Sequence, residues 1–183
     1  MKFLETRIAG AYLIEPEPTF DERGFFARIW DSEVFRSHGL NPNLSQCSVS
    51  FNQRKGTLRG MHFQVEPNAE TKLVRCTCGE IYDVIIDLRP ESPNYCQWLG
   101  TRLDAATRRM LYVPEGVAHG FQTLTDGAEV VYQISVSYHP ESARGIRWND
   151  PLFAIDWPED DRVISTRDQS FPDYVPQRIP CRK

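Results

Sequence analysis

The sequence predicts an all-β fold, in which a single domain of residues 1–183 forms a sandwich or barrel of the jelly-roll kind. Segments rich in β-branched residues recur at short intervals, turn signals with glycine or proline separate them, and helical periodicity is scarce. An alternating βαβ architecture would need helices of about 10–15 residues between the strands. The sequence offers no helical pattern of that length, and 183 residues suit one domain.

Each predicted element has its own local signal. The clearest strand segments are Lys72–Thr77, Ile81–Leu88, Met110–Val113 and Glu129–Ser137. The turns between strands are Cys78-Gly79, Arg89-Pro90, Pro114-Glu115-Gly116 and Thr125-Asp126-Gly127. A short helix is expected from Asp31, which is a capping residue, to His38, and a short turn over residues 103–109. From about Trp148 the chain is rich in proline and charge, which predicts an irregular C-terminal arm packed on the barrel.

Composition narrows the class of protein. The net charge of −4 argues against general affinity for nucleic acid or anionic membranes, because both require clustered positive charge. No apolar run approaches the length of about 18 residues that a membrane span requires, and the N-terminus does not read as a signal peptide. An odd number of cysteines favours free thiols in a reducing compartment, so we expect a cytoplasmic protein. The cysteines are Cys47, Cys76, Cys78, Cys96 and Cys181.

Two of the four histidines lie in glycine-containing segments that favour a close approach of strands. His62 belongs to TLRGMHFQ and His119 to VPEGVAHGF, whereas His38 and His139 are expected at the surface. Two such segments with strands between them are similar to the two motifs of the cupin barrel. A metal-binding cupin would show His-x-His in the first motif, but Gln64 follows His62, and a neutral amide is a poor transition-metal ligand.

The histidines therefore predict proton chemistry without a metal or another cofactor. Only Glu66 or Glu70 could complete a metal site, so a metal-dependent cupin stays as the less favoured alternative. Histidine changes charge near neutral pH, and a base also needs an orienting partner and an acid. From the residues alone, Asp168 and Asp83 are candidates for the partner, and Tyr132 and Tyr138 for the acid.

Longer strings extend across almost the whole chain: DERGFF from Asp21, GTLRGMHFQ from Gly56, KLVRCTCGEIYDVIIDLR from Lys72, VPEGVAHGFQTL from Val113, AEVVYQ from Ala128, GIRWNDP from Gly145 and ISTRD from Ile164. With these strings the chain resembles the dTDP-4-dehydrorhamnose 3,5-epimerase family, dimeric cupin-fold enzymes of deoxysugar synthesis. The resemblance implies a homodimer acting on a nucleotide-linked 4-keto sugar. It also implies a cupin-type jelly-roll barrel with short helices, and the alternating segment from Phe3 to Leu13 could supply an exchanged strand.

The resemblance implies a role for each site residue. His62 would be the base, Asp168 its orienting carboxylate, Tyr132 the acid on the opposite face, and Lys72 the partner of the enolate oxygen. A residue such as Lys72 would accelerate the reaction by stabilising negative charge that develops only in the transition state. The implied substrate contacts are Arg23, Arg28, Gln46, Arg59, His119, Tyr138 and Arg167.

The chain departs from the family pattern at substrate-contacting positions. Arg28 and Ala143 stand where family members usually have glutamate, and the loop before Gly56 is one residue longer. The sequence therefore predicts the reaction, but it leaves open which sugar and which nucleotide the substrate contains. The alternatives are an epimerase that inverts only C3 or C5 of another nucleotide sugar, and a sugar-nucleotide binding module without catalysis.

Overall fold

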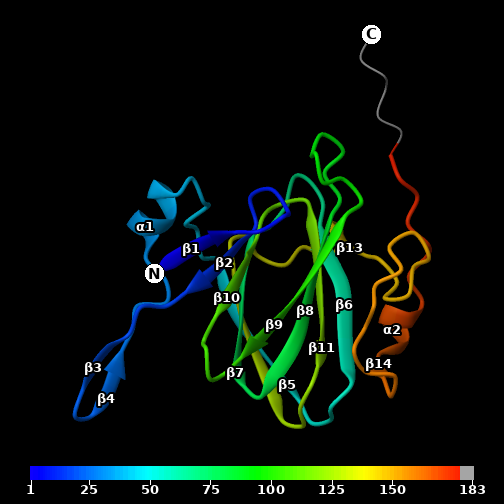
Figure 1. Cartoon of the computed structure of the whole chain (residues 1–183). Coiled ribbons are helices and arrows are strands. Elements are labelled where there is room, and N and C mark those ends of the chain that lie inside the picture. Colours follow the sequence, from blue (N-terminus) through cyan, green and yellow to red (C-terminus); the bar gives the residue numbers. More distant parts are fainter. Residues whose placement is uncertain (178–183) are drawn as a thin grey trace.

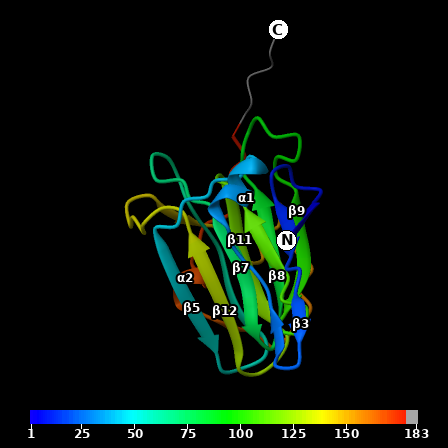
Figure 2. The same ribbon diagram turned by 90° about the vertical axis from the view of Figure 1, so that its left-hand side faces the viewer.

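A computed structural model describes residues 1–177 of the chain; Cys181, one of the predicted free thiols, lies outside the described residues. Two antiparallel sheets pack face to face (Figures 1 and 2). The first sheet has the order β1 (Lys2–Glu5), β2 (Tyr12–Glu15), β10 (Met110–Val113), β7 (Lys72–Cys78), β12 (Ala128–Ile134), β5 (Gln46–Asn52). The second has the order β13 (Ala143–Gly145), β6 (Thr57–Gln64), β11 (Val117–Thr123), β8 (Glu80–Asp87), β9 (Trp98–Asp104).

Smaller elements flank the sheets. Strand β14 (Val163–Ile164) pairs with β6 in parallel and leads into the short helix α2 (Thr166–Gln169). Strands β3 (Thr19–Asp21) and β4 (Gly24–Phe26) form a hairpin that projects from the opposite side of the molecule (Figure 1). Helix α1 (Ser32–Ser37) follows the hairpin.

The structure confirms the predicted all-β jelly-roll class and corrects some details. The four predicted strand segments are β7, β8, β10 and β12, although β12 ends at Ile134. Asp31 caps α1 as expected, because its Oδ1 accepts hydrogen bonds from the amides of Glu33 and Val34 at 3.0 and 3.2 Å. The segment from Phe3 to Leu13 contributes to β1 and β2, and β2 pairs with β1 and β10 of its own chain.

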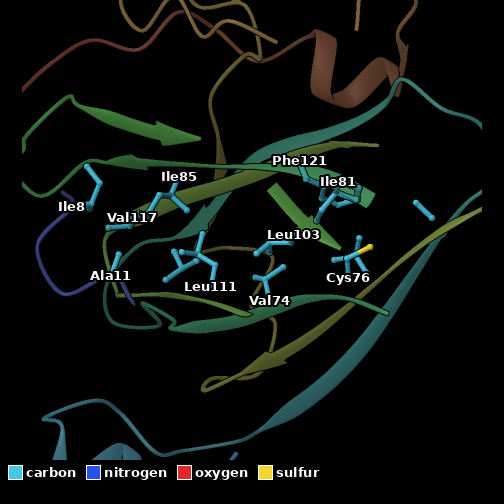
Figure 3. Close-up of a cluster of buried hydrophobic side chains, with 13 residues drawn as sticks. Ile8, Ala11, Val74, Cys76, Ile81, Ile85, Leu103, Leu111, Val117 and Phe121 are labelled. Atoms are coloured by element: carbon cyan, nitrogen blue, oxygen red, sulfur yellow. The ribbon is translucent and has the colours of Figure 1, made fainter. Parts of the chain in front are cut away.

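The main core lies between the two sheets (Figure 3). Alternate residues of each strand point into it, as the two-residue period of a strand requires. Its fully buried side chains include Val74 and Leu111 from the first sheet and Ile81, Ile85 and Phe121 from the second. This apolar core fills one part of the space between the sheets and leaves another part for the cavity described below.

The outer faces of the sheets are covered differently. The C-terminal arm places Ile146, Phe153 and Trp157 against the outer face of the second sheet. Helix α1 places Phe35 against part of the first sheet, where Leu73 and the strands β2 and β10 meet it. Among the described helices none is long and apolar enough to cross a membrane.

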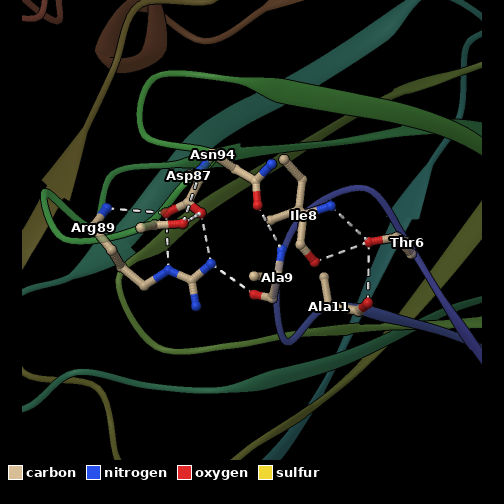
Figure 4. A network of polar contacts seen from close by, with 8 residues as sticks. Thr6, Ile8, Ala9, Ala11, Asp87, Arg89 and Asn94 are labelled. Carbon is tan, nitrogen blue, oxygen red and sulfur yellow. Dashed lines mark hydrogen bonds and ion pairs between the residues drawn. The ribbon is translucent and has the colours of Figure 1, made fainter.

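A polar network ties the N-terminal loop to the β8–β9 connection (Figure 4). Asp87 is fully buried, and its carboxylate accepts hydrogen bonds from the guanidinium of Arg89 at 2.8 and 2.6 Å and from Ser92 Oγ at 2.6 Å. Arg89 also donates to the carbonyl of Ala9 at 2.7 Å. Burial alone would raise the pKa of Asp87, but these hydrogen bonds outweigh it and lower the pKa.

Replacing Asp87 with asparagine is expected to lower the free energy of unfolding by about 2 kcal/mol at pH 7, because the network loses its charge-assisted bonds. A carboxylate with a lowered pKa stabilises the fold above its unfolded-state pKa, and the contribution disappears as the pH falls through the folded-state pKa. Urea unfolding should therefore show a smaller difference at pH 3 than at pH 7. An equal difference at both pH values would contradict this account.

Candidate active site

A cavity of about 420 Å³ opens between the two sheets at the side where the arm returns to β6. Most of the residues predicted for the site line it: Gln46, Arg59, His62, Lys72, His119, Tyr132, Tyr138, Arg167 and Asp168. They come from strands of both sheets, from the connection after β12 and from α2. The cavity therefore brings together residues that lie up to 122 positions apart in the sequence, from Gln46 to Asp168.

Strand β6 contributes two cavity residues that a regular strand would place on opposite faces. Arg59 and His62 are three positions apart, yet both line the cavity. The pairing of β6 with β11 is irregular between these positions, since His62 pairs with His119 but Arg59 pairs with Phe121. Gly60 has φ +134° and lies against Gly120, so a side chain at Gly60 would meet the facing backbone. The two glycines thus permit the bulge that turns both side chains inward.

His62 and Asp168 form the first His–Asp pair of the cavity. Asp168 Oδ1 lies 2.8 Å from His62 Nε2, and Asp168 Oδ2 accepts the Gly60 amide at 3.2 Å. The side chain of Asp168 is 6% exposed and that of His62 is 41% exposed. Burial alone would raise the pKa of Asp168, but the hydrogen bond and charge of His62, with the Gly60 amide, outweigh burial and lower it. With Nε2 engaged by the carboxylate, Nδ1 is the ring nitrogen available to take a proton.

Asp168 reaches the cavity through the cap of α2. The hydroxyl of Ser165 accepts the Asp168 amide at 3.1 Å, which starts the helix and directs the carboxylate toward β6. The preceding strand β14 attaches this segment to Thr57 and Leu58 of β6. The sequence string that carries Asp168 is therefore placed by local capping and one short parallel pairing.

A second His–Asp pair lies deeper. His119 Nε2 is 2.8 Å from Asp83 Oδ1, and both side chains are buried. The ring of Tyr132 meets the ring of His119 edge-on, with 5.9 Å between centroids. Burial raises the pKa of Tyr132, and the negative charge of Asp83 adds to the shift. The Tyr132 hydroxyl therefore keeps its proton at neutral pH and has it available to donate.

Lys72 is the first residue of β7; it is buried and lines the cavity. Its Nζ donates to the backbone carbonyl of His62 at 3.1 Å and forms an ion pair with Glu70 at 2.9 Å. Glu70, considered above as a metal ligand, is thus the partner of a lysine. Among residues 1–177, no group of three or more His, Cys, Asp or Glu side chains is arranged to hold a metal ion.

Hydrogen bonds orient the polar residues at the mouth of the cavity. Arg59 Nε donates to Asn52 Oδ1 at 2.8 Å, and the Tyr138 amide donates to Gln46 Oε1 at 3.3 Å. The side chain of Tyr138 is exposed, as is Arg167. These groups can contact a ligand that extends from the cavity toward solvent.

Two predicted contacts, Arg23 and Arg28, do not line the cavity of their own chain. Arg23 lies at the tip of the β3–β4 hairpin and pairs with Asp21, while Arg28 pairs with Asp31 at 3.0 Å. The hairpin extends away from β6 and α2 (Figure 1). Ala143, the other departure from the family pattern, does line the cavity.

Phe171 contacts the His62 ring, and no motif in the sequence indicates this contact. The two rings meet edge-on, with 6.0 Å between centroids. Gly145 pairs with His62 on the neighbouring strand, and a β-carbon at Gly145 would overlap the Phe171 ring. The only available signal was the position of Phe171, three residues after Asp168.

Substituting Gly145 with alanine is expected to push the Phe171 ring away from His62 and to lower kcat by about 10- to 100-fold, because a misplacement of about 1 Å in an active site can cost about 100-fold. A Phe171→Ala variant should lose a similar amount, since it removes the same contact. In the double variant the two losses should not add, because the alanine then meets no ring. Additive losses in kcat would show that Gly145 acts through something other than Phe171.

The chain is similar to known proteins in both sequence and structure. The family described as dTDP-4-dehydrorhamnose 3,5-epimerase matches residues 5–175. The dTDP-4-dehydrorhamnose 3,5-epimerase of Methanothermobacter thermautotrophicus is 44% identical over 173 residues, which cover 93% of this chain and 92% of that protein. The crystal structure of the Bacillus anthracis enzyme of the same name, with TDP and PPi bound, is 40% identical with a TM-score of 0.91 and covers 94% of this chain and 99% of that one.

A second similar structure has a different specificity. It is a 3'-monoepimerase from Streptomyces bikiniensis in complex with dTDP-quinovose. That chain is 32% identical, with a TM-score of 0.85, and the match covers 92% of this chain and 85% of that one. The same fold therefore carries both one-carbon and two-carbon specificity among proteins similar to this chain.

Proposed function

Because this chain belongs to the dTDP-4-dehydrorhamnose 3,5-epimerase family, we propose that it inverts C3 and C5 of a dTDP-4-keto-6-deoxyhexose during dTDP-L-rhamnose-type synthesis. The observation that carries the proposal is the His62–Asp168 pair, which faces Tyr132 across one cavity. A hydrogen beside a ketone is weakly acidic, so its removal needs a base and a stabilised enolate oxygen. The cavity holds a candidate for each role.

In the proposed first step His62 takes the proton from the carbon beside the C4 ketone. The Asp168 carboxylate favours the imidazolium that forms, and it fixes the ring through Nε2. Lys72 donates to the oxygen as negative charge develops there. No electrons leave the substrate, since one proton is removed and one is returned, so the reaction needs no redox cofactor.

In the second step Tyr132 returns a proton to the opposite face of the sugar. Tyr132 belongs to β12 of the first sheet and His62 to β6 of the second, so the two side chains come from facing walls. Inversion requires this arrangement, because a proton returned by the base itself would restore the starting configuration. The raised pKa of Tyr132 keeps its proton in place until the enolate takes it.

The diphosphate and the nucleotide are assigned to the mouth of the cavity. Arg59 and Arg167 offer planar guanidinium groups suited to phosphate oxygens. Gln46 and Tyr138 lie beside them and suit the nucleoside or sugar. His119 lines the deeper wall, where it can contact a sugar hydroxyl.

We infer that the chain acts as a homodimer in which the partner supplies Arg23 and Arg28. The outer face of β5, an edge strand, exposes Val49 and Phe51, and the β3–β4 hairpin exposes Phe20 and Phe26. Apolar side chains on a strand edge and a projecting hairpin favour association. Sedimentation should give twice the monomer mass of 21.1 kDa. A monomer that is fully active would contradict the assignment of the arginines to the partner.

The function is tested by incubating the protein in D₂O with dTDP-linked and other nucleotide-linked 4-keto sugars and following the products by NMR. Deuterium at both C3 and C5 supports the two-carbon reaction. Deuterium at only one carbon supports the second candidate, a one-carbon epimerase. Two observations favour testing it: the similar Streptomyces protein is a 3'-monoepimerase, and Ala143 lines the cavity. Absence of exchange with every such sugar would overturn the proposal.

The proposed substrate class and the free thiols of the protein lead us to place it in the cytoplasm. These thiols are Cys47, Cys76, Cys78 and Cys96.

A further inference from the structure

The carboxylate of Glu70 is held at the cavity wall by two different partners. Its Oε1 lies 2.9 Å from Lys72 Nζ, and its Oε2 accepts Gln64 Nε2 at 3.0 Å. Gln64 is itself fixed, since its Oε1 accepts the His139 amide at 2.6 Å. Because each oxygen of Glu70 has its own partner, the orientation of the carboxylate is fixed on both sides.

Two of the three N–H donors of Lys72 have partners within the protein, which leaves one for a ligand. An ammonium group has three N–H donors and no acceptor. One is directed to Glu70 and one to the backbone carbonyl of His62 at 3.1 Å. Since Lys72 lines the cavity, the third can point to a ligand atom there. The bond to His62 also ties the lysine to the strand that carries the base.

The counter-ion of the Lys72 ammonium is the carboxylate of Glu70. The side chains of both residues are only 9% exposed, and an ammonium with so little water around it needs a charged partner. The other cationic groups of the cavity wall include Arg59, Arg144 and Arg167, which disfavour a further positive charge. The second cavity carboxylate, that of Asp168, is bound by His62. Glu70 is therefore the carboxylate that offsets the charge of Lys72.

We propose that Glu70 is a positioning residue for the reaction: its carboxylate keeps Lys72 charged and aims the free N–H of Lys72 at the oxygen of the bound ketone. This inference rests on the proposed function, which assigns Lys72 to that oxygen. Gln64, in turn, holds Glu70 in the orientation that Lys72 requires. A neutral amine in the same place would stabilise the enolate much less, because its electrostatic attraction to the oxygen is lost.

The first test uses Glu70→Gln, which keeps the shape of the side chain and removes its charge. We expect kcat to fall about 10-fold, as when a charge-assisted hydrogen bond becomes a neutral one, while KM changes little. The alkaline limb of the kcat–pH profile should move to lower pH, because Lys72 then loses its proton more easily. Glu70→Asp should recover part of the loss in kcat, since it restores the charge at a shorter reach.

The matched control is Glu66→Gln, which removes the same charge from an exposed position on the same connection. It should leave kcat and the pH profile unchanged. A merely structural role for Glu70 would lower the stability of Glu70→Gln but leave its pH profile where the wild type has it. That outcome would overturn the proposal.

A second measurement does not depend on turnover. The Lys72 side-chain ¹³Cε signal, assigned by its absence in Lys72→Arg, is titrated by NMR in the wild type and in Glu70→Gln. The proposal expects the lysine of Glu70→Gln to deprotonate at lower pH, and identical titrations would overturn it whatever the activity. If the titrations differ but the wild type exchanges no deuterium into any 4-keto sugar, the coupling stands and the proposed function fails.

Discussion

Replacing His62 with alanine is expected to lower kcat about 10³-fold, the middle of the range for a positioned acid–base group. Deuterium exchange at C3 and C5 should disappear together, because in the proposed mechanism the same imidazole removes both protons. Asp168→Asn is expected to lose a comparable amount, since an amide cannot stabilise the imidazolium and can hold the ring in the wrong tautomer. The measurement is NMR of the substrate in D₂O, with the same dTDP-linked 4-keto sugar for each variant.

The control for these variants is binding. His62→Ala should bind dTDP as the wild type does, because the mouth of the cavity, with Arg59 and Arg167, is unchanged. His38→Ala removes a histidine next to α1, outside the cavity, and should keep full activity. Exchange at one carbon but not the other in His62→Ala would show that a second base serves that carbon.

Tyr132 is the proposed acid of the reaction. Tyr132→Phe is expected to retain exchange within about 10-fold of the wild type and to lose inversion by about 10²-fold or more. The base still removes the proton, but no donor remains on the opposite wall, so the solvent-exchanged proton returns to its original face. NMR should find deuterium in a sugar whose configuration is unchanged.

Tyr12→Phe is the matched control, since Tyr12 packs beside α1 on the outer face of the first sheet. It should change neither exchange nor inversion. Normal inversion in Tyr132→Phe would remove the acid role from this residue. Loss of exchange and inversion together would indicate that the hydroxyl is needed to bind the sugar rather than to protonate it.

The sequence predicted the fold class well because strand and turn signals are local. β-Branched runs and glycine turns identified β7, β8, β10 and β12 without any knowledge of their neighbours. The strand β6 was recognised as a histidine motif but not as a bulged strand. The bulge arises from the contact of Gly60 with Gly120, and a contact over 60 positions leaves no periodicity in either segment.

Pairings across the sheets could be predicted only through resemblance. The residues alone left Asp83 and Asp168 as equal candidates for the partner of the base, and the structure places Asp168 on His62 and Asp83 on His119. The partnership of Glu70 with Lys72 was not predicted, because a carboxylate in a connection between strands is ordinarily exposed. Its burial follows from Gln64, which folds the connection back onto β6.

The last part of the C-terminal arm, residues 158–177, carries Asp168 and contributes little to the buried core. In residues 158–177 only Asp168 is buried, and β14 holds this stretch to β6 through two residue pairs. Such a segment opens at lower free energy than strands with a large buried face. Mild denaturant or limited proteolysis of the arm should therefore extinguish turnover while the two sheets still resist unfolding. Inactivation of this protein would then report on one peripheral segment, and its melting curve on another part of the molecule.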